Sequence, residues 1–346
     1  MKTWQKIKEH PELLDQYLIR GKVIDGIREF FKAREFHEVE TPLLVRSPGT
    51  EPYLEVFETA IHFAEGDHER AFLLTSPEYS MKKLLVAGMK NIFQISKSFR
   101  NGEGRSSKHN HEFTILEYYR TDADYTKLMT DLEELFLFLI QKIKASSETK
   151  MSYQKNLLDF STPWPRMSVS EAFQQWVGVS SDQLLDRNAL AEAAEKRGYQ
   201  VTTETTWEEI YNQLFLNEIE PKFPIDRPLF LYDYPITQAA LSRPKKDDPR
   251  FAERFELYIA GVEIGNAFSE LNDPNEQERR LRAEVEERKK LGKVEYGIDE
   301  DFIQALHAGM PDSAGIAIGV DRVIMLLADT PSIHETMFFP ISEIFE

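Results

Sequence analysis

The stretch from residue 98 to residue 119 restricts the fold of this chain more than any other. An apolar run, Ile92 to Phe99, precedes Arg100 and a glycine- and serine-rich loop, and a second extended run reaches from Glu112 to Tyr119. Two extended runs joined in this way predict a β-hairpin with a basic tip, and such tips often carry binding groups. An arginine at the root of the hairpin suits bidentate recognition of phosphate.

One face of the second run mixes polar and apolar side chains. Because alternate residues of a strand share a face, one side is expected to carry Phe113, Ile115, Glu117 and Tyr119. A carboxylate and a phenol beside two apolar residues predict a ligand-facing surface rather than a core. On this stretch alone, a structural hairpin with a solvated charged loop is the alternative.

Composition and charge narrow the class of protein. The 346 residues are enough for one large or two medium domains, and a hydrophobic content of 41% supports a substantial core. The absence of cysteine excludes disulfides and cysteine-built metal sites. The net charge of -17 weighs mildly against a surface that binds nucleic-acid phosphates. No apolar run reaches transmembrane length, and the first residues lack the apolar centre of a signal peptide, so we expect a cytoplasmic protein without membrane contacts.

Hydrophobic periodicity predicts several helices and strands along the chain. The predicted helices cover residues 3–35, 79–87, 124–144 and 276–293, and another begins at Asp321. The predicted strands cover residues 36–44, 71–74, 92–99, 112–119, 229–234, 251–259, 262–269 and 314–320. A loop punctuated by glycine and proline is expected at 47–58, and a helical insertion at about 150–222.

Two carboxylates flank the strand predicted at 262–269. Strict alternation gives one face a common set of side chains, namely Ile264, Asn266, Phe268 and Glu270. Glu263 faces the other way unless a β-bulge intervenes, and Gly265 permits one. Two carboxylates near one strand suit a hard divalent cation such as magnesium, which takes oxygen ligands and bridges nucleotide phosphates. Two solvent-facing acids are the alternative for this strand alone.

A small-residue strand followed by an arginine forms a further candidate site. Residues 315–322 read GIAIGVDR, and the glycines allow a ligand to approach the backbone closely. Arg322 lies at the start of a predicted helix, where the helix dipole disfavours a cation. We therefore expect Arg322 to serve a bound anion or to stack on a base.

Several stretches together resemble class II aminoacyl-tRNA synthetases of the lysyl type. The resemblance rests on TSPEYSMKKLLVAG, FQISKSFRN, HNHEFTILEYY, RFELYIAGVEIGNAFSELNDP, GMPDSAGIAIGVDR and the near-terminal FFP. These stretches follow the family's order over almost the whole chain. The resemblance implies an α+β fold, an antiparallel sheet flanked by helices, in a single catalytic domain spanning 1–346. It also implies an enzyme that activates an amino acid with ATP and Mg2+.

The resemblance assigns roles to individual positions. Arg100 and Arg322 would be the catalytic cations that stabilise the displacement electrostatically. Glu263 and Glu270 would hold magnesium. The nucleotide would contact Arg100, Asn101, Glu103, Asn110, Phe113, Glu263, Ile264, Gly319 and Arg322. The amino acid would contact Ser76, Pro77, Glu78, Glu117, Tyr119, Asn266, Phe268, Glu270 and Ala317, and Glu78 and Glu117 would face its ammonium groups.

The resemblance extends to one branch of the family. Lysyl-tRNA synthetases carry an anticodon-binding OB domain before motif 1, whereas motif 1 of this chain begins about thirty residues after Met1, so no such domain is expected. The chain is similar to the truncated paralogues that modify elongation factor P. This similarity implies (R)-β-lysine or lysine as substrate, a lysine side chain of elongation factor P as acceptor, and no role for tRNA. The segment that resembles motif 1 implies a homodimer. The alternatives are tRNA charging, an ammonia-using asparagine synthetase and a non-catalytic regulatory paralogue.

Three positions depart from the pattern of lysyl-tRNA synthetases. Gly102 interrupts the usual Arg-Asn-Glu of motif 2, and His111 replaces a proline. Ala317 stands where those enzymes usually have glycine, so its methyl group would narrow the pocket near the substrate. We hypothesise that Ala317 changes the selection between α- and β-amino acids.

Overall fold

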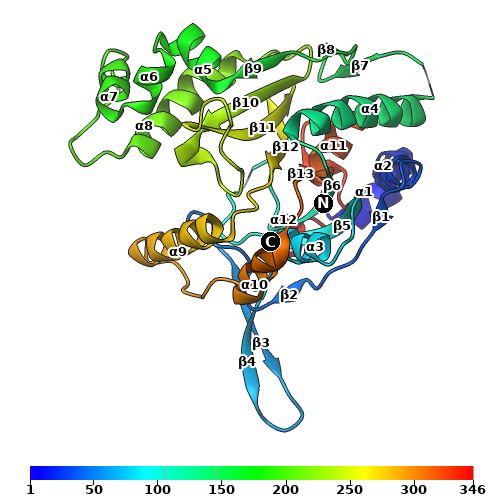
Figure 1. Ribbon diagram of the computed structural model, residues 1–346. Coiled ribbons are helices and arrows are strands. Elements are labelled where there is room, and N and C mark those ends of the chain that lie inside the picture. Colours follow the sequence, from blue (N-terminus) through cyan, green and yellow to red (C-terminus); the bar gives the residue numbers. More distant parts are fainter. Residues whose placement is uncertain (105, 146, 346) are drawn as a thin grey trace.

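The computed structural model describes residues 1–104, 106–145 and 147–345 (Figure 1). Its centre is an eight-stranded sheet in the order β1-β5-β6-β13-β12-β11-β10-β9. The six inner strands are antiparallel, and each edge strand pairs in parallel with its neighbour, so the sheet is mixed only at its edges. The α+β class is thereby confirmed. The strands are β1 (His37–Glu38), β5 (Ile92–Phe99), β6 (Glu112–Thr121), β9 (Arg166–Ser168), β10 (Leu229–Pro235), β11 (Phe251–Ile259), β12 (Val262–Ser269) and β13 (Ser313–Gly319).

Three helices cover one face of this sheet. α2 (Leu14–Lys32), α4 (Tyr125–Lys144) and α11 (Val320–Leu327) share a core with apolar strand residues such as Phe93, Tyr118 and Ile316. Because side chains alternate along β6, the burial of Tyr118 in this core turns Glu117 and Tyr119 toward the opposite face. The opposite face therefore carries the mixed row of side chains that the sequence predicts.

The opposite face is only partly covered. α3 (Glu78–Val86), α9 (Pro274–Lys290) and α10 (Glu300–Gly309) surround a smaller core that includes Met81, Leu281 and Phe302. α3 begins at Glu78, after Ser76 and Pro77, as its polar and proline-bearing start predicts. These three helices leave cavities above the inner strands, and the candidate site lies there.

The expected insertion is mostly helical and packs on the end of the sheet. Its apolar residues form a core with Leu231 and Tyr258 of the inner strands. It begins with a two-stranded hairpin that the sequence interpretation did not include. Its elements are β7 (Lys150–Tyr153), β8 (Asn156–Asp159), α5 (Val169–Ala172), a π-turn (Phe173–Val177), α6 (Ser181–Leu185), α7 (Arg187–Glu195), α8 (Trp207–Leu214), and two short turns (Phe215–Ile219 and Glu220–Lys222).

The structure corrects two predictions near the N-terminus. The helix predicted at 3–35 is broken into α1 (Thr3–Glu9), a 3-10 turn (Pro11–Leu13) and α2, because Pro11 lacks the N–H that a continuous helix needs. The strand predicted at 36–44 is reduced to β1 and β2 (Leu44–Val45) on either side of Pro42. Both errors come from apolar spacing that continues across a proline.

A hairpin that the sequence interpretation missed projects from the body of the molecule. β3 (Phe57–His62) and β4 (His68–Leu73) pair with each other, and β2 extends them to a three-stranded sheet (Figure 1). The first two residues of β3 lie in the loop predicted at 47–58, and β4 begins three residues before the strand predicted at 71–74. Most of β3 is solvent-exposed, so it lacks the alternation of buried residues on which the prediction relied. The remaining short elements are Ile236–Gln238, Ile333–Glu335 and α12 (Ile341–Ile344). In the described residues, every helix is too short or too polar to span a lipid bilayer.

Candidate active site

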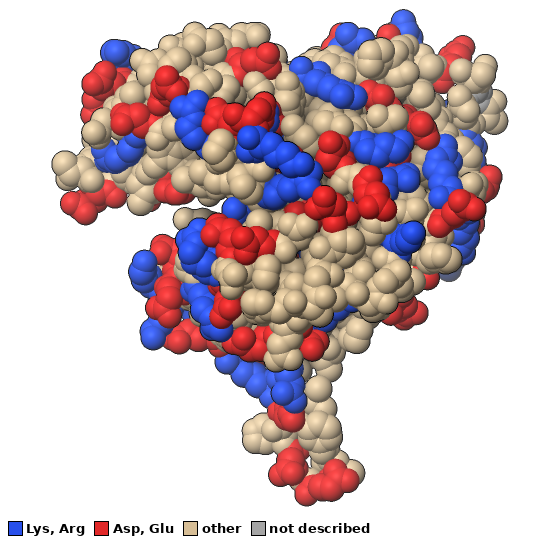
Figure 2. All heavy atoms as spheres, in the orientation of Figure 1, with Lys and Arg blue, Asp and Glu red and all other residues tan. Residues whose placement is uncertain are grey.

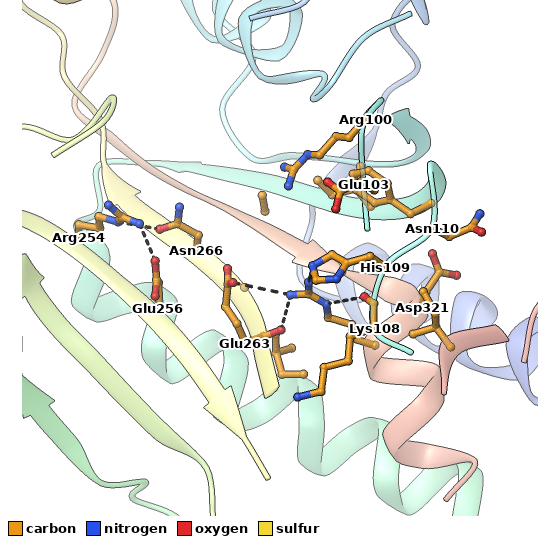
Figure 3. Close-up of a pocket in the computed structure, with 18 residues that line it drawn as sticks. Arg100, Glu103, Lys108, His109, Asn110, Arg254, Glu256, Glu263, Asn266 and Asp321 are labelled. Carbon is orange, nitrogen blue, oxygen red and sulfur yellow. Dashed lines mark hydrogen bonds and ion pairs between the residues drawn. The ribbon is translucent and has the colours of Figure 1, made fainter. Parts of the chain in front are cut away.

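Two adjoining cavities lie on the partly covered face of the sheet. The first, of about 270 Å³, is lined by basic and acidic residues that include Arg100, Arg322 and Glu263, and we call it the arginine cavity (Figure 3). The second, of about 530 Å³, is lined by six buried or half-buried acids, and we call it the acidic cavity. Those acids are Glu51, Glu78, Glu117, Glu208, Glu270 and Glu284. The residues that border both cavities are Arg100, Ile115, Arg254, Asn266 and Ala317.

Arg100 lies where β5 ends and the hairpin loop begins. Its backbone N–H donates to His111 O across the hairpin (2.9 Å). Its guanidinium carbon lies 5.2 Å from the ring centre of Phe113 on β6, a cation–π distance. Its buried Nε has no hydrogen-bond partner among the described residues. A buried, unpartnered donor on a cation is well suited to bind an anionic ligand.

Arg322 enters the same cavity from the start of α11. Its neighbour Asp321 accepts the backbone N–H of Thr114 (2.7 Å) and pairs with Arg20, which fixes the helix start against β6 and α2. Arg322 Nη1 donates to Glu263 O (2.7 Å), and Nη2 donates to His109 Nε2 (3.0 Å) in the hairpin loop. Burial and the charge of Arg322 lower the pKa of His109, which keeps the ring neutral and able to accept.

A β-bulge brings Glu263 to the arginine cavity. Leu257 pairs with Gly265, but Tyr258 pairs with Glu263, so Ile264 is the extra residue on β12. The bulge that Gly265 permits is therefore present. Glu263 and Asn266 both line the cavity, whereas Ile264 is 1% exposed and packs in the main core, although it borders the cavity.

Glu256, and not Glu270, lines the arginine cavity together with Glu263. Seven residues of extended chain separate Glu263 from Glu270, on the order of 20 Å at a strand's rise per residue, which is too far for one ion to contact both. Glu256 on β11 lines the arginine cavity with Glu263. Burial raises the pKa of Glu263, and the charge of Glu256 raises it further. The structure thus places the two acids of the predicted magnesium pair in different cavities, and their role in holding the ion stays a prediction.

The acidic cavity is built from β6, the start of α3 and the end of β12. Ser76 Oγ donates to Glu117 Oε1 (2.5 Å), and Tyr119 Oη donates to Glu117 Oε2 (3.2 Å). A β-carbon added at Gly315 would lie 2.3 Å from the Tyr119 ring and 2.6 Å from Glu270 Oε1. The Tyr119 ring and the Glu270 carboxylate therefore both lie directly over this glycine. The sequence-predicted acids and phenol therefore surround one space.

One buried lysine already sits among these acids. Lys82 Nζ lies 2.5 Å from Glu78 Oε1 and 2.5 Å from Glu270 Oε2, and its side chain is 1% exposed. Burial raises the pKa of Glu117 to about 8, with a further contribution from the charge of Glu78. Burial likewise raises the pKa of Glu270 to about 7, although Lys82 opposes the shift. The cavity therefore has more carboxylates than cations and favours a cationic ligand.

The comparisons with known proteins agree with this site. The family model of class II tRNA synthetases (D, K and N) matches residues 3–343. The chain belongs to this family. The lysine–tRNA ligase of Moorella thermoacetica is 38% identical over 334 residues, which are 96% of this chain and 66% of the relative. The corresponding ligases of Pelotomaculum thermopropionicum (37% over 337 residues) and Magnetococcus marinus (38% over 329 residues) are each covered to 64% of their length. The chain thus spans slightly less than two thirds of these relatives.

Most residues assigned by resemblance to this class II family line one of the two cavities. Glu103, Asn110, Phe113, Gly319 and Arg322 line the arginine cavity, and Ser76, Tyr119 and Phe268 line the acidic cavity. Two assigned residues lie outside both linings as the described residues define them. Asn101 is exposed and accepts the N–H of Gly102 (2.9 Å), and Pro77 caps α3. Asn110 also anchors the C-terminal segment, because its Oδ1 accepts the N–H of Ile341 (3.1 Å).

Sequence reasoning missed two charged residues on β11. Arg254 borders both cavities, with Nε donating to Asn266 Oδ1 (3.0 Å) and Nη2 donating to Glu256 Oε1 (2.5 Å) (Figure 3). Glu256 also accepts the hydroxyls of Tyr234 and Tyr258, both at 2.6 Å. The sequence did carry a signal, because Arg254 and Glu256 are two residues apart in a predicted strand and therefore share a face.

The site fits magnesium only as a partner of phosphate. The described residues contain no group of three or more metal-binding side chains in suitable geometry. Mg2+ at nucleotide sites commonly takes one or two carboxylates and completes its shell with phosphate oxygens and water. Glu256 and Glu263 supply two carboxylates at the edge of the arginine cavity, so they are the residues that would hold the ion.

Proposed function

We propose that this chain joins a lysine-type diamino acid, (R)-β-lysine or lysine, to AMP and transfers it to a lysine side chain of elongation factor P. The observation that carries the first step is the junction of the two cavities. A phosphate-binding arginine cavity and a cation-binding acidic cavity share Arg100, Arg254 and Asn266. An amino acid held by its ammonium groups would thus present its carboxylate to a nucleotide.

The reaction is an in-line displacement at the α-phosphorus of ATP. A carboxylate oxygen of the amino acid forms a bond to phosphorus, and pyrophosphate leaves with the electrons of the broken P–O bond. Arg100 can contact both the carboxylate and the α-phosphate because it borders both cavities. Its charge would stabilise the transition state without a protein nucleophile. Magnesium held by Glu256 and Glu263 would neutralise charge on the phosphates.

The acceptor proposal rests on charge and on the resemblance to elongation factor P-modifying paralogues. The acidic cavity is lined by Glu208 of α8 and Glu284 of α9, and Figure 2 shows the surface hollowed between the insertion and α9. Acids along this opening favour an approaching amine over the phosphates of tRNA. In the transfer step the amine nitrogen would attack the carbonyl carbon, AMP would leave, and the amine would lose one proton.

A transfer assay tests the acceptor. Labelled (R)-β-lysine or lysine, ATP and Mg2+ are incubated with the enzyme and either elongation factor P or total tRNA. We expect label on elongation factor P and none above background on tRNA. The relatives are lysine–tRNA ligases, which supports tRNA charging as a second candidate, and label on tRNA alone would establish it instead.

We also propose that the protein is a homodimer through α2 and β1. β1 covers only Ile92 and Phe93 of β5, so in the described chain the β5 edge from Gln94 onward has no neighbouring strand. A second copy would cover this edge. Light scattering at micromolar concentration should give twice the chain mass of 40.2 kDa, and a monomer would contradict the proposal.

Binding of the amino acid should strengthen as pH rises. In the empty cavity Glu117, with a pKa of about 8, and Glu270, with a pKa of about 7, hold protons that a bound ammonium group would displace. We expect the amino-acid KM in ATP–pyrophosphate exchange to fall roughly tenfold or more between pH 6 and pH 8. The KM for ATP serves as the internal control, and a flat amino-acid KM would show that these acids do not bind the cation.

Replacing Ala317 with glycine should change which isomer is preferred. Ala317 borders both cavities and pairs with Glu117 on β6 and Asn266 on β12, so its methyl group lies at the junction. We expect the kcat/KM ratio of lysine to (R)-β-lysine to rise about tenfold in Ala317→Gly, the effect of one methyl group in a pocket. Ala314→Gly, on the core face of the same strand, is the matched control. An unchanged kcat/KM ratio in Ala317→Gly would contradict the hypothesis that Ala317 selects between the isomers.

A further inference from the structure

The loop between β10 and β11 forms one wall of the acidic cavity. We call residues 236–244 the wall loop. It begins with the 3-10 turn Ile236–Gln238, and it contributes to the cavity lining together with the buried acids. The contributing residues are Thr237, Gln238, Ala240 and Leu241. The shape of this loop therefore sets the width of the cavity.

The wall loop is bonded directly to the segment that carries Glu270. Arg243 N–H donates to Ser269 O (2.9 Å), and Leu271 N–H donates to Leu241 O (2.9 Å). These bonds place Ser242 opposite Glu270 in an isolated antiparallel bridge. A shift of the wall loop would thus move the backbone of an acid that we place in the amino-acid pocket.

The wall loop contains a conformation that alanine disfavours. Ala240 has a φ of +49°, in the left-handed region where a β-carbon crowds the backbone. Ala240 is also solvent-exposed, so apolar packing does not hold it in place. A residue in this conformation persists only where its surroundings fix it.

Arg280 on α9 makes hydrogen bonds that hold the wall loop at Ala240. Its Nη1 donates to Ala240 O (3.0 Å) and to Ser242 O (2.9 Å), the carbonyls on either side of Leu241. Its Nε donates to Glu276 Oε1 one turn earlier on α9 (2.8 Å), which orients the guanidinium. The Arg280 side chain is only 13% exposed, and it lies outside the cavity lining formed by the described residues.

We propose that Arg280 is a positioning residue for amino-acid selection, holding the wall loop in the shape that closes the acidic cavity around its ligand. This inference rests on the proposed activation of a diamino acid. Arg280 acts through the carbonyls of Ala240 and Ser242, and it contacts neither the amino acid nor the nucleotide. Its loss should therefore weaken amino-acid binding and leave ATP binding intact.

Steady-state ATP–pyrophosphate exchange with Arg280→Met tests this role. We expect the amino-acid KM to rise about tenfold, the effect of losing charge-assisted hydrogen bonds, and the KM for ATP to change less than about twofold. Arg279→Met is the matched control, because Arg279 binds the same Glu276 but is 68% exposed, and its hydrogen bonds in the described residues go to Glu276 rather than to the wall loop. In the double variant Arg280→Met/Ala240→Gly, glycine takes the left-handed conformation without penalty, so most of the KM increase should be reversed.

A second readout does not depend on catalysis. Amide hydrogen exchange of residues 239–243, followed by mass spectrometry, should be faster in Arg280→Met than in the wild type and in Arg279→Met. Equal exchange rates, equal rises in the KM for both substrates, or no rescue by glycine would each overturn the role of Arg280. A wild-type enzyme that exchanges pyrophosphate with no diamino acid would instead overturn the proposed function, and the hydrogen-exchange comparison would still decide whether Arg280 holds the loop.

Discussion

Replacing Arg100 with alanine is expected to reduce ATP–pyrophosphate exchange by at least ~10³-fold, mainly in kcat. Arg100, at the root of the hairpin, borders both cavities, as does Arg254, and the buried Arg100 Nε has no hydrogen-bond partner among the described residues. In the proposed reaction no side chain acts as a nucleophile, so electrostatic stabilisation would provide most of the rate enhancement. Arg100→Lys should recover little of the activity, because an ammonium group cannot make two parallel hydrogen bonds to a carboxylate or phosphate.

The matched control for Arg100 is Arg46→Ala. Arg46 is 84% exposed and pairs with Glu69 on the projecting hairpin, so its removal should leave exchange within about twofold of wild type. Thermal unfolding of each variant would separate loss of chemistry from loss of folding. More than a tenth of wild-type activity in a folded Arg100→Ala variant would rule out the central role of this arginine.

Replacing Glu117 with glutamine is expected to raise the amino-acid KM about 100-fold and to leave the KM for ATP nearly unchanged. Glu117 is 1% exposed, and it accepts one hydrogen bond at each carboxylate oxygen, from Ser76 at Oε1 and from Tyr119 at Oε2. In glutamine the amide oxygen can keep one of these bonds, and the amide NH2 group can donate to the other hydroxyl. The substitution therefore removes the charge and preserves the shape. A bound ammonium group would lose a buried countercharge that water cannot replace.

Glu112→Gln is the control on the same strand. Glu112 side-chain exposure is 50%, and its ion pair with Lys97 lies at the surface, so its neutralisation should change neither KM. A Glu117→Gln variant with an unchanged amino-acid KM would show that the acidic cavity does not select the substrate by charge. An equal loss of ATP affinity would indicate a general distortion of β6.

The hairpin β5–β6 was predictable from the sequence because local rules and the tertiary environment agree there. Both strands are long, one face is apolar and buried, and the other face lines the cavities, so period-two alternation places Glu117 and Tyr119 on the cavity side. The strands β11 and β12 match the predicted ranges for the same reason. The break in the helix at Pro11 was missed because the apolar spacing continues across the proline, and β3 was missed because it is mostly exposed and has no alternation of buried residues.

The errors within the site have a different origin. Strict alternation cannot reveal a bulge, so the sequence only allowed Glu263 to face the cavity, and it placed Ile264 on the wrong face. Glu263 and Glu256 line the same cavity because of the register between β11 and β12, and the pattern of one strand does not encode that register. The wall loop and its anchor Arg280 are linked across forty residues by bonds to backbone carbonyls, for which a sequence carries no residue-specific signal.

Amino-acid-dependent ATP–pyrophosphate exchange is the most direct measurement of whether the two cavities work together. The assay compares (R)-β-lysine, lysine, aspartate and asparagine at saturating ATP and Mg2+, with the wild-type chain and with Arg100→Ala as the inactive reference. We predict exchange with (R)-β-lysine and lysine and none with aspartate, whose extra carboxylate the acidic cavity would repel. Exchange with aspartate, or no exchange with either lysine isomer, would contradict the proposed function.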